Sequence, residues 1–322
     1  MPRKKAVGTS GTTRQRVWWR LRQQWRMLGV FEINPEHEFY YLTCVIKEGM
    51  QAVIQASMDT PPEDKLTEKH FKAVETQTHE GFEIQTFAAP VFAKLRHSLD
   101  ITEEEYLNSL CLGGYYLKFV SNSKSKADFF VTNDKWFFLK TQSRREVRFL
   151  LSNLQAYVDH LEKYPHSLMV RFLGVFKIVI PNQIKKYFIV MQSVFYPDER
   201  INIRYSLNVH SEFCCVDLCL VYKVMLLLHR YDIKGCEVGR RTNPDTGGKQ
   251  MIKVLKDNNF EGQYIALGQD KPWFADQVKV DTAFLQGLNV LDYSLLLAHQ
   301  PLHRDERDGK HSLANLVVRA TK

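Results

Sequence analysis

A single aspartate inside an apolar segment restricts how this chain can fold more than any other feature of its sequence. The segment is Asn289-Val-Leu-Asp-Tyr-Ser-Leu-Leu-Leu297, and its leucines favour a buried position. A carboxylate is buried at low cost only beside a cation, a metal ion or several hydrogen-bond donors. Asp292 is therefore expected at the edge of a buried element, directed outward. It is either a rigidly held catalytic or metal-facing acid, or the N-cap of a helix.

Two further segments upstream of Asp292 help to interpret the apolar segment that contains it. They are Tyr231-Asp-Ile-Lys-Gly-Cys-Glu-Val-Gly-Arg-Arg241 and Leu255-Lys-Asp-Asn-Asn-Phe260. With the Asp292 segment, they resemble in order the "YDLKGS…R", "KDxDF" and "MDYSLL" segments of the phosphatidylinositol phosphate kinases. The resemblance covers roughly residues 28–300. It implies an α+β, two-lobed kinase-like lipid kinase fold with antiparallel sheets, and a C-terminal lobe that is incomplete in this chain.

The resemblance also implies functional residues, each with a structural alternative. Asp292 is the expected catalytic acid. Lys140 ends an apolar strand and is the expected ATP-phosphate lysine, unless it only extends from the strand end to solvent. Glu146 is either the ion-pair partner of Lys140 or the reciprocal cap on Ser143, where a helix begins that is predicted to run to about Lys163.

The remaining implied site residues belong to the hinge and to the substrate. Gln192 and Phe195 bound the segment expected to hold adenine through backbone groups. Lys234 is the expected lipid-phosphate lysine, with a solvated turn as the alternative. Arg240 and Arg241 follow it closely, and guanidinium groups favour an anionic ligand.

Three features depart from the family pattern. The loop Ser121–Asp128 contains no glycine, although glycine lets backbone N–H groups approach nucleotide phosphates closely. Arg204-Tyr205 recurs as Arg230-Tyr231, which indicates an atypical insertion near residues 206–230 that interrupts a sheet strand. The insertion is either unspliced or mispredicted sequence, or an inserted helix. No Ile-Ile-Asp, Val-Val-Asp or Asp-Phe-Gly motif follows Leu297, so the metal ligands are unknown.

The positive charge of the chain is concentrated at its N-terminus. The net charge is +8, from 44 basic and 36 acidic residues. Residues 1–27 form a basic arm that also carries tryptophan, the residue that settles at lipid headgroups. The excess charge does not continue into the body, which argues against a nucleic-acid partner. Eight basic residues and no acidic residue occur in 1–26: Arg3, Lys4, Lys5, Arg14, Arg16, Arg20, Arg22 and Arg26.

These features predict location and organisation. The longest apolar run, Val216–Leu228, is too short to span a bilayer and contains Asp217 and Lys223. We expect a cytoplasmic protein, peripheral at the plasma membrane and bound to anionic phosphoinositides. The arm is expected to precede a kinase-like domain over residues 28–300 and a polar tail over residues 301–322.

The resemblance implies ATP and Mg²⁺ as cofactors, with conversion of phosphatidylinositol 4-phosphate to the 4,5-bisphosphate in the family. The departures predict that this chain is weakly active or inactive. The alternative is a non-catalytic phosphoinositide- and kinase-binding scaffold that partners active family members. A homodimer or a heterodimer with family kinases is expected from the resemblance of residues 82–110 to the region that helps form the family dimer.

Overall fold

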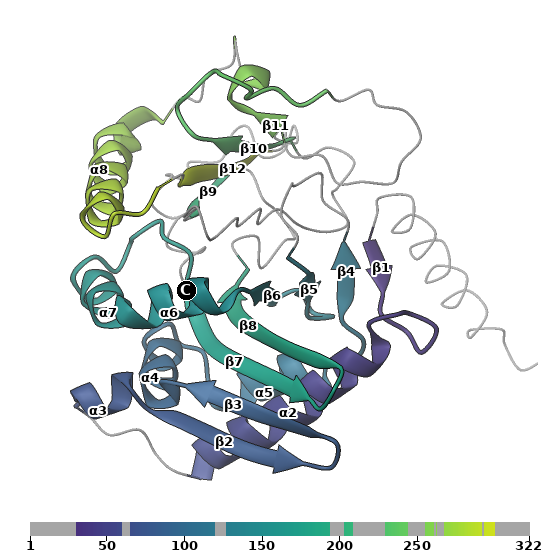
Figure 1. Cartoon of the computed structure of the whole chain (residues 1–322). Helices are drawn as coiled ribbons and strands as arrows, with labels where there is room; N and C mark the ends of the chain where they lie inside the picture. The colour runs from purple at the N-terminus through teal and green to yellow at the C-terminus, as the bar shows by residue number, and fades with distance from the viewer. Residues whose placement is uncertain are drawn as a thin grey trace, which may run out of the picture.

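The computed structural model of the chain describes residues 30–59, 65–119, 127–193, 203–208, 229–243, 255–260, 262, 267–291 and 293–299. These residues form two lobes, each built on its own β-sheet (Figure 1). The N-terminal arm, most of the glycine-free loop, Phe195, most of the predicted insertion, Asp292 and the C-terminal tail lie outside the described residues. Within the described residues, no helix is both long enough and apolar enough to cross a membrane.

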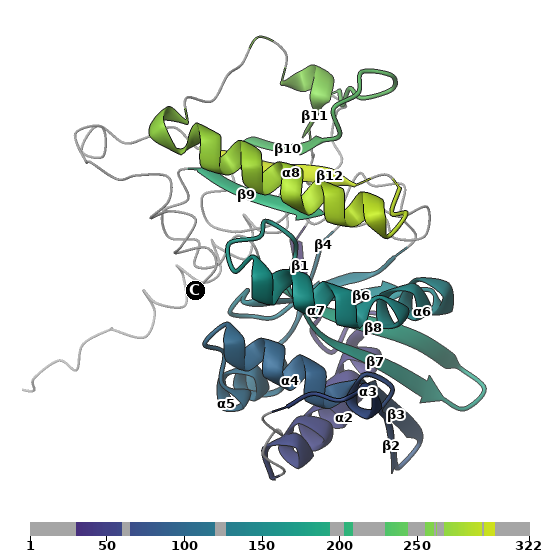
Figure 2. The same ribbon diagram turned by 90° about the vertical axis from the view of Figure 1, so that its left-hand side faces the viewer.

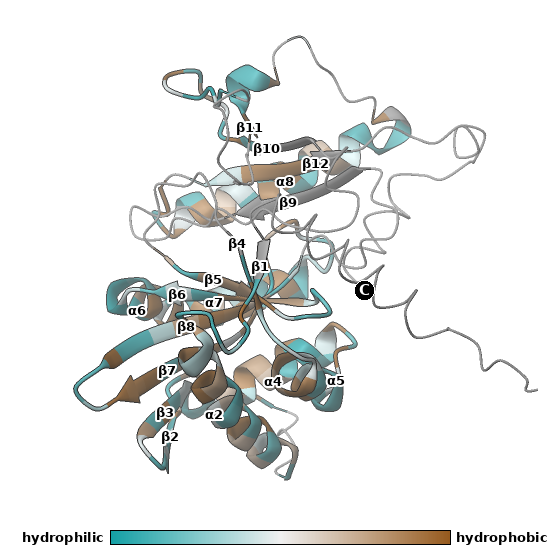
Figure 3. Ribbon diagram, turned by 90° about the vertical axis from the view of Figure 1, so that its right-hand side faces the viewer, coloured by the Kyte–Doolittle hydropathy of each residue, from teal (hydrophilic) through white to brown (hydrophobic). Residues whose placement is uncertain are grey.

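The larger lobe contains an antiparallel sheet with the strand order β1-β4-β5-β6-β8-β7-β3-β2. Its central strands are apolar on both faces, and β8 changes from hydrophilic to hydrophobic along its length (Figure 3). This pattern is expected of a sheet covered by helices on both sides. The strands are β1 (Val30–Glu32), β2 (Val74–His79), β3 (Phe82–Phe87), β4 (Leu117–Phe119), β5 (Phe129–Val131), β6 (Phe137–Gln142), β7 (Phe172–Ile180) and β8 (Ile184–Gln192).

Helices cover the two faces of this sheet and define two apolar cores. Successive side chains of a strand point to opposite faces, so Phe137 and Leu139 lie in one core and Phe138 lies in the other. The first core includes α2 (Tyr40–Asp59), α5 (Glu103–Leu107) and the π-helical turn η1 (Asn108–Leu112). The second includes α4 (Ala89–Ser98), α6 (Arg144–Ser152) and α7 (Leu154–Lys163), and the short α3 (Glu68–Phe71) packs beside it.

The capping box predicted at Ser143 is confirmed, but the long helix after it is divided. The Ser143 hydroxyl accepts from the backbone of Glu146, and the Glu146 carboxylate accepts from the backbone of Ser143. The predicted single helix ends at Asn153, whose amide nitrogen donates to the carbonyl of Phe149 at 2.8 Å. This local bond competes with continuation of the helix, so α6 ends and α7 begins there.

The smaller lobe contains a four-stranded sheet with the order β11-β10-β12-β9. The pairing of β10 with β11 is parallel, and the other pairs are antiparallel, so the predicted α+β fold with mostly antiparallel sheets is confirmed. Figure 2 shows helix α8 running along this sheet. The elements are β9 (Ile203–Asn208), β10 (His229–Ile233), β11 (Leu255–Lys256), η2 (Asp257–Asn259), η3 (Gly268–Asp270), α8 (Lys271–Gly287) and β12 (Ser294–His299).

The repeated Arg-Tyr dipeptide marks two strands, and not one interrupted strand. Tyr205 in β9 pairs with Leu297 in β12, and Tyr231 in β10 pairs with the same residue from the other side. The two copies of the dipeptide therefore occupy equivalent positions on either side of β12. Whether residues 206–230 are an atypical insertion stays a prediction, because most of them lie outside the described residues.

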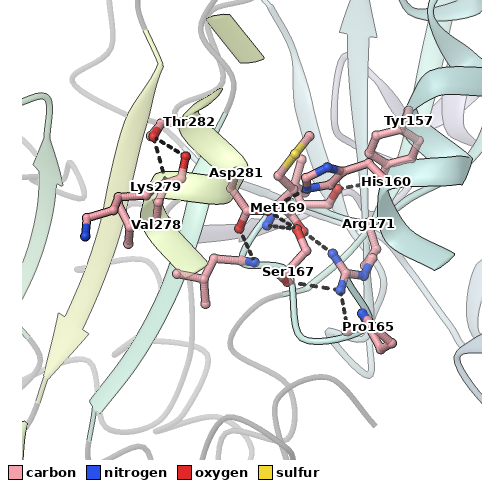
Figure 4. A network of polar contacts seen from close by, with 12 residues as sticks. Tyr157, His160, Pro165, Ser167, Met169, Arg171, Val278, Lys279, Asp281 and Thr282 are labelled. Carbon is pink, nitrogen blue, oxygen red and sulfur yellow. Dashed lines mark hydrogen bonds and ion pairs between the residues drawn. The ribbon is translucent and has the colours of Figure 1, made fainter. Parts of the chain in front are cut away.

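A buried carboxylate joins the two lobes. Helix α8 buries a stripe of three residues spaced four apart, Gln277, Asp281 and Leu285. The side chain of Asp281 is fully buried and accepts from the Ser167 hydroxyl at 2.7 Å and from the Leu168 backbone at 2.8 Å (Figure 4). Its Oδ1 atom also lies 2.7 Å from His160 Nε2. These donors are what a buried carboxylate requires.

Ser167 and Leu168 belong to the loop between α7 and β7, residues 164–171. The buried guanidinium of Arg171 also holds this loop. Arg171 donates to the carbonyls of Met169 at 2.7 Å, Ser167 at 3.0 Å and Pro165 at 3.1 Å. The carbonyl of Arg171 in turn accepts from the backbone of Gln192 at 3.0 Å. The end of β8 is therefore connected through this loop to α8 in the other lobe.

Replacing Asp281 with alanine should destabilise the protein strongly. The change leaves the buried hydroxyl of Ser167 and the N–H of Leu168 without their acceptor, so we expect a loss of about 3 kcal/mol in the free energy of unfolding. The control is Asp276→Ala on the same helix, where the side chain is exposed and pairs only with Lys279 at 3.3 Å. That variant should lose less than about 0.5 kcal/mol. Urea unfolding measures both, and equal losses would contradict the assigned role.

Candidate functional site

The loop after β10 is held by a single carboxylate from the following segment. Asp257 Oδ1 accepts from the backbone N–H groups of Lys234 and Gly235, both at 2.8 Å. Asp257 Oδ2 accepts from Arg240 Nε at 2.7 Å. The two segments that carry the family resemblance are thus joined at this residue, and Lys234 is placed at the end of a strand by backbone bonds.

Arg240 is buried between two carboxylates. Its guanidinium donates to Asp257, to the carboxylate of Asp232 at 2.8 Å and to the Asp232 carbonyl. Burial by itself would lower the pKa of Arg240, but the hydrogen bonds to both aspartates outweigh it and raise the pKa. Burial by itself would raise the pKa of Asp257, but the donors from Arg240, Gly235 and Lys234 hold it below its ordinary value.

Two asparagines complete the support of this loop. Asn258 donates twice to the loop, from its backbone to the Arg240 carbonyl at 2.9 Å and from its side chain to the Glu237 carbonyl at 2.9 Å. The Asn259 amide exchanges bonds with the backbone of Thr242 at 2.7 and 2.8 Å. The loop conformation is therefore set by protein contacts and does not require a ligand.

Strand pairing places Lys234, the predicted lipid-phosphate lysine, at the end of the small sheet where β12 begins. The last pair of β10 with β12 is Ile233 with Leu295. Lys234 follows this pair directly, and the chain that precedes Leu295 contains Asp292. Asp292 itself lies outside the described residues, so its role stays a prediction. Its interpretation as a helix N-cap is excluded, because the residues after it form strand β12 and no helix.

Ser294, at the start of β12, carries an orphaned polar atom. Its side chain is buried, and its hydroxyl has no hydrogen-bond partner among the residues that the structure describes. A buried hydroxyl without a partner costs about 1–3 kcal/mol. A phosphate oxygen or a bound water would satisfy it, so this position fits an oxygen-rich ligand beside the segment that contains Asp292.

Lys140 lies in the middle of the larger lobe and not at a solvated strand end. It is 1% exposed, pairs with Phe129 in β5 and Ile189 in β8, and places its ammonium nitrogen 5.6 Å from the centre of the Phe129 ring. The alternative of a side chain that merely extends into water is therefore wrong. Its contact with ATP phosphate stays a prediction.

Glu146 acts as the reciprocal cap of α6. One of its carboxylate oxygens accepts from the Ser143 backbone at 2.5 Å. The Gln142 amide, with its nitrogen turned toward Glu146, lies 2.8 and 3.1 Å from the two carboxylate oxygens. These contacts give the carboxylate a structural role, and an ion pair with Lys140 stays a prediction.

The structure describes the first part of the predicted hinge, Gln192 and Ser193. Gln192 ends β8, is buried, and pairs with Phe137. The next residue, Ser193, donates from its backbone to the Trp136 carbonyl at 2.9 Å. Phe195 lies outside the described residues. The backbone contacts that hold adenine in a kinase hinge stay a prediction here.

The three predicted substrate-phosphate residues have different surroundings. Lys234 is half-buried and Arg241 is exposed, so both can face a ligand from the end of the sheet. Arg240 is committed to its two aspartates, and phosphate binding by it stays a prediction that these contacts do not favour. Sequence reasoning missed Asp257 and Asp232 as the residues that position this loop.

The family implies ATP and a divalent cation, and the described residues fit the first better than the second. Buried Lys140, cationic Lys234 and the orphaned Ser294 hydroxyl suit phosphate oxygens. Among the described residues, no group of three acidic, histidine or cysteine side chains is placed to hold a metal ion. When bound, the metal would offset charge on the transferred phosphoryl group.

Two lobes with separate sheets, a buried lysine in the larger sheet and a cationic loop at the end of the smaller one define a kinase-like α+β protein. Comparison with protein families matches residues 111–208 and 216–321 to the family described as Phosphatidylinositol-4-phosphate 5-Kinase. The chain belongs to this family of lipid kinases, which generally use ATP and Mg²⁺.

Individual relatives agree with this assignment. Over 311 residues the chain is 47% identical to phosphatidylinositol 4-phosphate 5-kinase-like protein 1 of Homo sapiens, covering 97% of this chain and 72% of the relative. The protein of the same name from Mus musculus is 44% identical over 305 residues, covering 94% and 71%. Phosphatidylinositol 4-phosphate 5-kinase 3 of Arabidopsis thaliana is 28% identical over 241 residues, covering 74% and 29%.

Replacing Asp257 with asparagine should destabilise the site in a pH-dependent way. We expect a loss of about 2 kcal/mol in the free energy of unfolding at pH 7, because three donors lose a charged acceptor. The folded pKa of Asp257 lies below the ordinary value of 3.8. Its stabilisation is therefore present above that pH and is lost as the pH falls through the folded pKa.

The control for this prediction is Glu237→Gln, which neutralises an exposed carboxylate of the same loop. Unfolding curves between pH 7 and pH 3 should show the difference between parent and Asp257→Asn shrinking at the acid end. A difference that stays constant with pH would show that the Asp257 charge does not matter.

Proposed function

We propose that this chain binds ATP and a phosphatidylinositol phosphate, and transfers the γ-phosphoryl group to an inositol hydroxyl slowly compared with other family members. The observation that carries the proposal is the placement of Lys234. Asp257 fixes this residue at the end of β10, beside the chain segment that contains Asp292. A cation for the lipid phosphate and a carboxylate that accepts the proton of the attacking hydroxyl are the groups that this transfer needs.

The larger lobe supports the nucleotide half of the proposal. Phe129 and Phe138 lie beside Lys140 in the sheet and share a buried cluster with Val290 and Leu296 of the smaller lobe. The lysine is therefore held rigidly close to the junction of the lobes.

Two observations support a slow rate. The loop Ser121–Asp128 has no glycine, so close backbone approach to the phosphates is restricted. Glu146 is held in the cap of α6. Small errors in position cost on the order of a hundredfold in rate. The capping role of Glu146 also favours the alternative function, a non-catalytic phosphoinositide- and kinase-binding scaffold.

We propose a peripheral location at the cytoplasmic face of the plasma membrane, with phosphatidylinositol 4-phosphate as the substrate. The basic arm of residues 1–26 supports this location through attraction to anionic lipid. A homodimer or a heterodimer with family kinases also belongs to the proposal. The exposed edge strand β2, whose Val74 is 55% exposed, offers unpaired backbone groups for such contacts.

ATP should raise the melting temperature of the parent protein through preferential binding to the folded state. Lys140→Met keeps the length of the buried side chain, removes its charge, and should abolish this shift. Lys185→Met, at an exposed position of β8, should leave the shift unchanged. Thermal unfolding with and without ATP and Mg²⁺ measures both variants. An intact shift in Lys140→Met would remove this lysine from the nucleotide site.

Phosphoryl transfer is tested directly with labelled ATP, Mg²⁺ and vesicles containing phosphatidylinositol 4-phosphate. We expect bisphosphate formation on the order of a hundredfold slower than in an active family kinase. Asp292→Asn should abolish the remaining product, whereas Asp276→Asn on the exposed face of α8 should not. Product formation that survives Asp292→Asn would exclude Asp292 as the acid. Absence of product from the parent would leave the scaffold as the function.

A further inference from the structure

The loop that carries Lys234 ends in an aliphatic side chain directed into solvent. Val238 is 94% exposed, the highest value among the exposed large hydrophobic residues of the described chain. Gly235 and Gly239 adopt positive φ angles of 74° and 69° and bend the chain on either side of Cys236-Glu237-Val238. A Cβ atom at either glycine would meet nothing within 4 Å, so backbone conformation and not packing requires glycine there.

This tip is held firmly although it touches little of the protein. The Glu237 carbonyl accepts from Asn258 Nδ2 at 2.9 Å and from the Arg240 backbone at 3.2 Å. The Gly235 backbone donates to Asp257 at 2.8 Å. Because these bonds fix the loop before any partner arrives, little ordering entropy is lost when the tip binds something.

A second exposed apolar side chain lies at the same end of the small sheet. Leu291 is 57% exposed and precedes β12, while the Val238 loop follows β10. The last pair of these two strands, Ile233 with Leu295, brings both segments to one end, as Figure 2 shows. Among the described residues, Val238 and Leu291 are the exposed large hydrophobic residues of the smaller lobe.

Cationic side chains accompany these two apolar residues. Lys234 and Arg241 flank the loop, and Lys256 lies on the adjacent strand β11, whereas Glu237 is the exposed carboxylate of the tip. Arg240 adds little free charge, because two aspartates surround it. Exposed apolar side chains surrounded by lysine and arginine are typical of surfaces that lie in a membrane interface.

We propose that this end of the smaller lobe docks on a bilayer that contains anionic lipid, with Val238 inserted at the level of the headgroups. Lys234 and Arg241 then contact lipid phosphates beside it. The proposal rests on the proposed function, since a kinase of membrane lipids must bring its phosphate-binding lysine to the bilayer surface. It adds the surface that does so, which is separate from the basic N-terminal arm.

The test measures partition of the full chain onto sedimentable vesicles of phosphatidylcholine, phosphatidylserine and phosphatidylinositol 4-phosphate. Val238→Asp should weaken partition about tenfold, because it removes an inserted apolar group and adds a charge of the wrong sign. Val238→Leu should strengthen it about threefold, by one additional buried methylene. Neither change should alter the melting temperature, because the side chain is exposed.

The matched control is Val74→Asp, which makes the same change at an exposed valine of the larger lobe. It should leave partition unchanged. Equal weakening by Val74→Asp and Val238→Asp would mean that only added charge matters, and would overturn the proposal. Unchanged partition of both Val238 variants would also overturn it.

Ionic strength distinguishes the electrostatic contribution of Lys234 and Arg241 from the apolar contribution of Val238. The effect of Lys234→Ala and Arg241→Ala should fade as ionic strength rises, whereas the effect of Val238→Leu should persist. Loss of the Val238→Leu effect at high salt would contradict insertion. Binding of soluble inositol phosphates to the parent, measured alongside, reports the phosphate site itself. If the parent binds soluble inositol phosphates but the Val238 variants partition onto vesicles as the parent does, the docking surface is rejected and the proposed function stands.

Discussion

The structure depends on the cost of burying charge at two junctions. Asp281 lies without solvent contact between α8 and the loop that leads to β7, and a serine hydroxyl, a backbone N–H and a histidine surround it. Arg240 lies between Asp232 and Asp257 in the smaller lobe. In each case removal of one partner leaves the others buried without compensation, so the elements on both sides are held in one relative position.

The first junction is connected to the proposed nucleotide site, and the second is connected to the proposed lipid-phosphate site. Through Ser167 and Arg171, the position of Asp281 is transmitted to the backbone of Gln192 at the end of β8. Through Asp257, the segment after β11 sets the backbone of Lys234 at the end of β10. The two candidate halves of a phosphoryl-transfer site are thus each fixed by a carboxylate that touches no substrate, which is the support that positioned catalysis requires.

What the sequence predicted well is local or covered by the family resemblance. The capping box at Ser143 depends on residues three positions apart, and it is present. The break at Asn153 was missed because the apolar period continues through it, while a side-chain bond ends the helix. Asp281 was missed because its partners lie 113 to 121 positions away, and no spacing in the sequence reveals such a contact. Asp257 was visible in its segment, but its role depends on donors 17 to 23 positions upstream.

The repeated Arg-Tyr dipeptide is explained by strand direction. Strands β9 and β10 are both antiparallel to β12, so they are parallel to each other and lie on opposite sides of it. Parallel strands cannot be joined by a tight turn, because the chain must return to the starting end of the sheet. In the sequence, residues 209–228 separate β9 from β10. Removal of residues 206–231 would leave one copy of the dipeptide, and β12 would lose a neighbouring strand. Strand β12 has a neighbour on both sides because the dipeptide occurs twice. Ser294 pairs with Asn208 in β9, and Leu295 pairs with Leu207 in β9 and with Ile233 in β10.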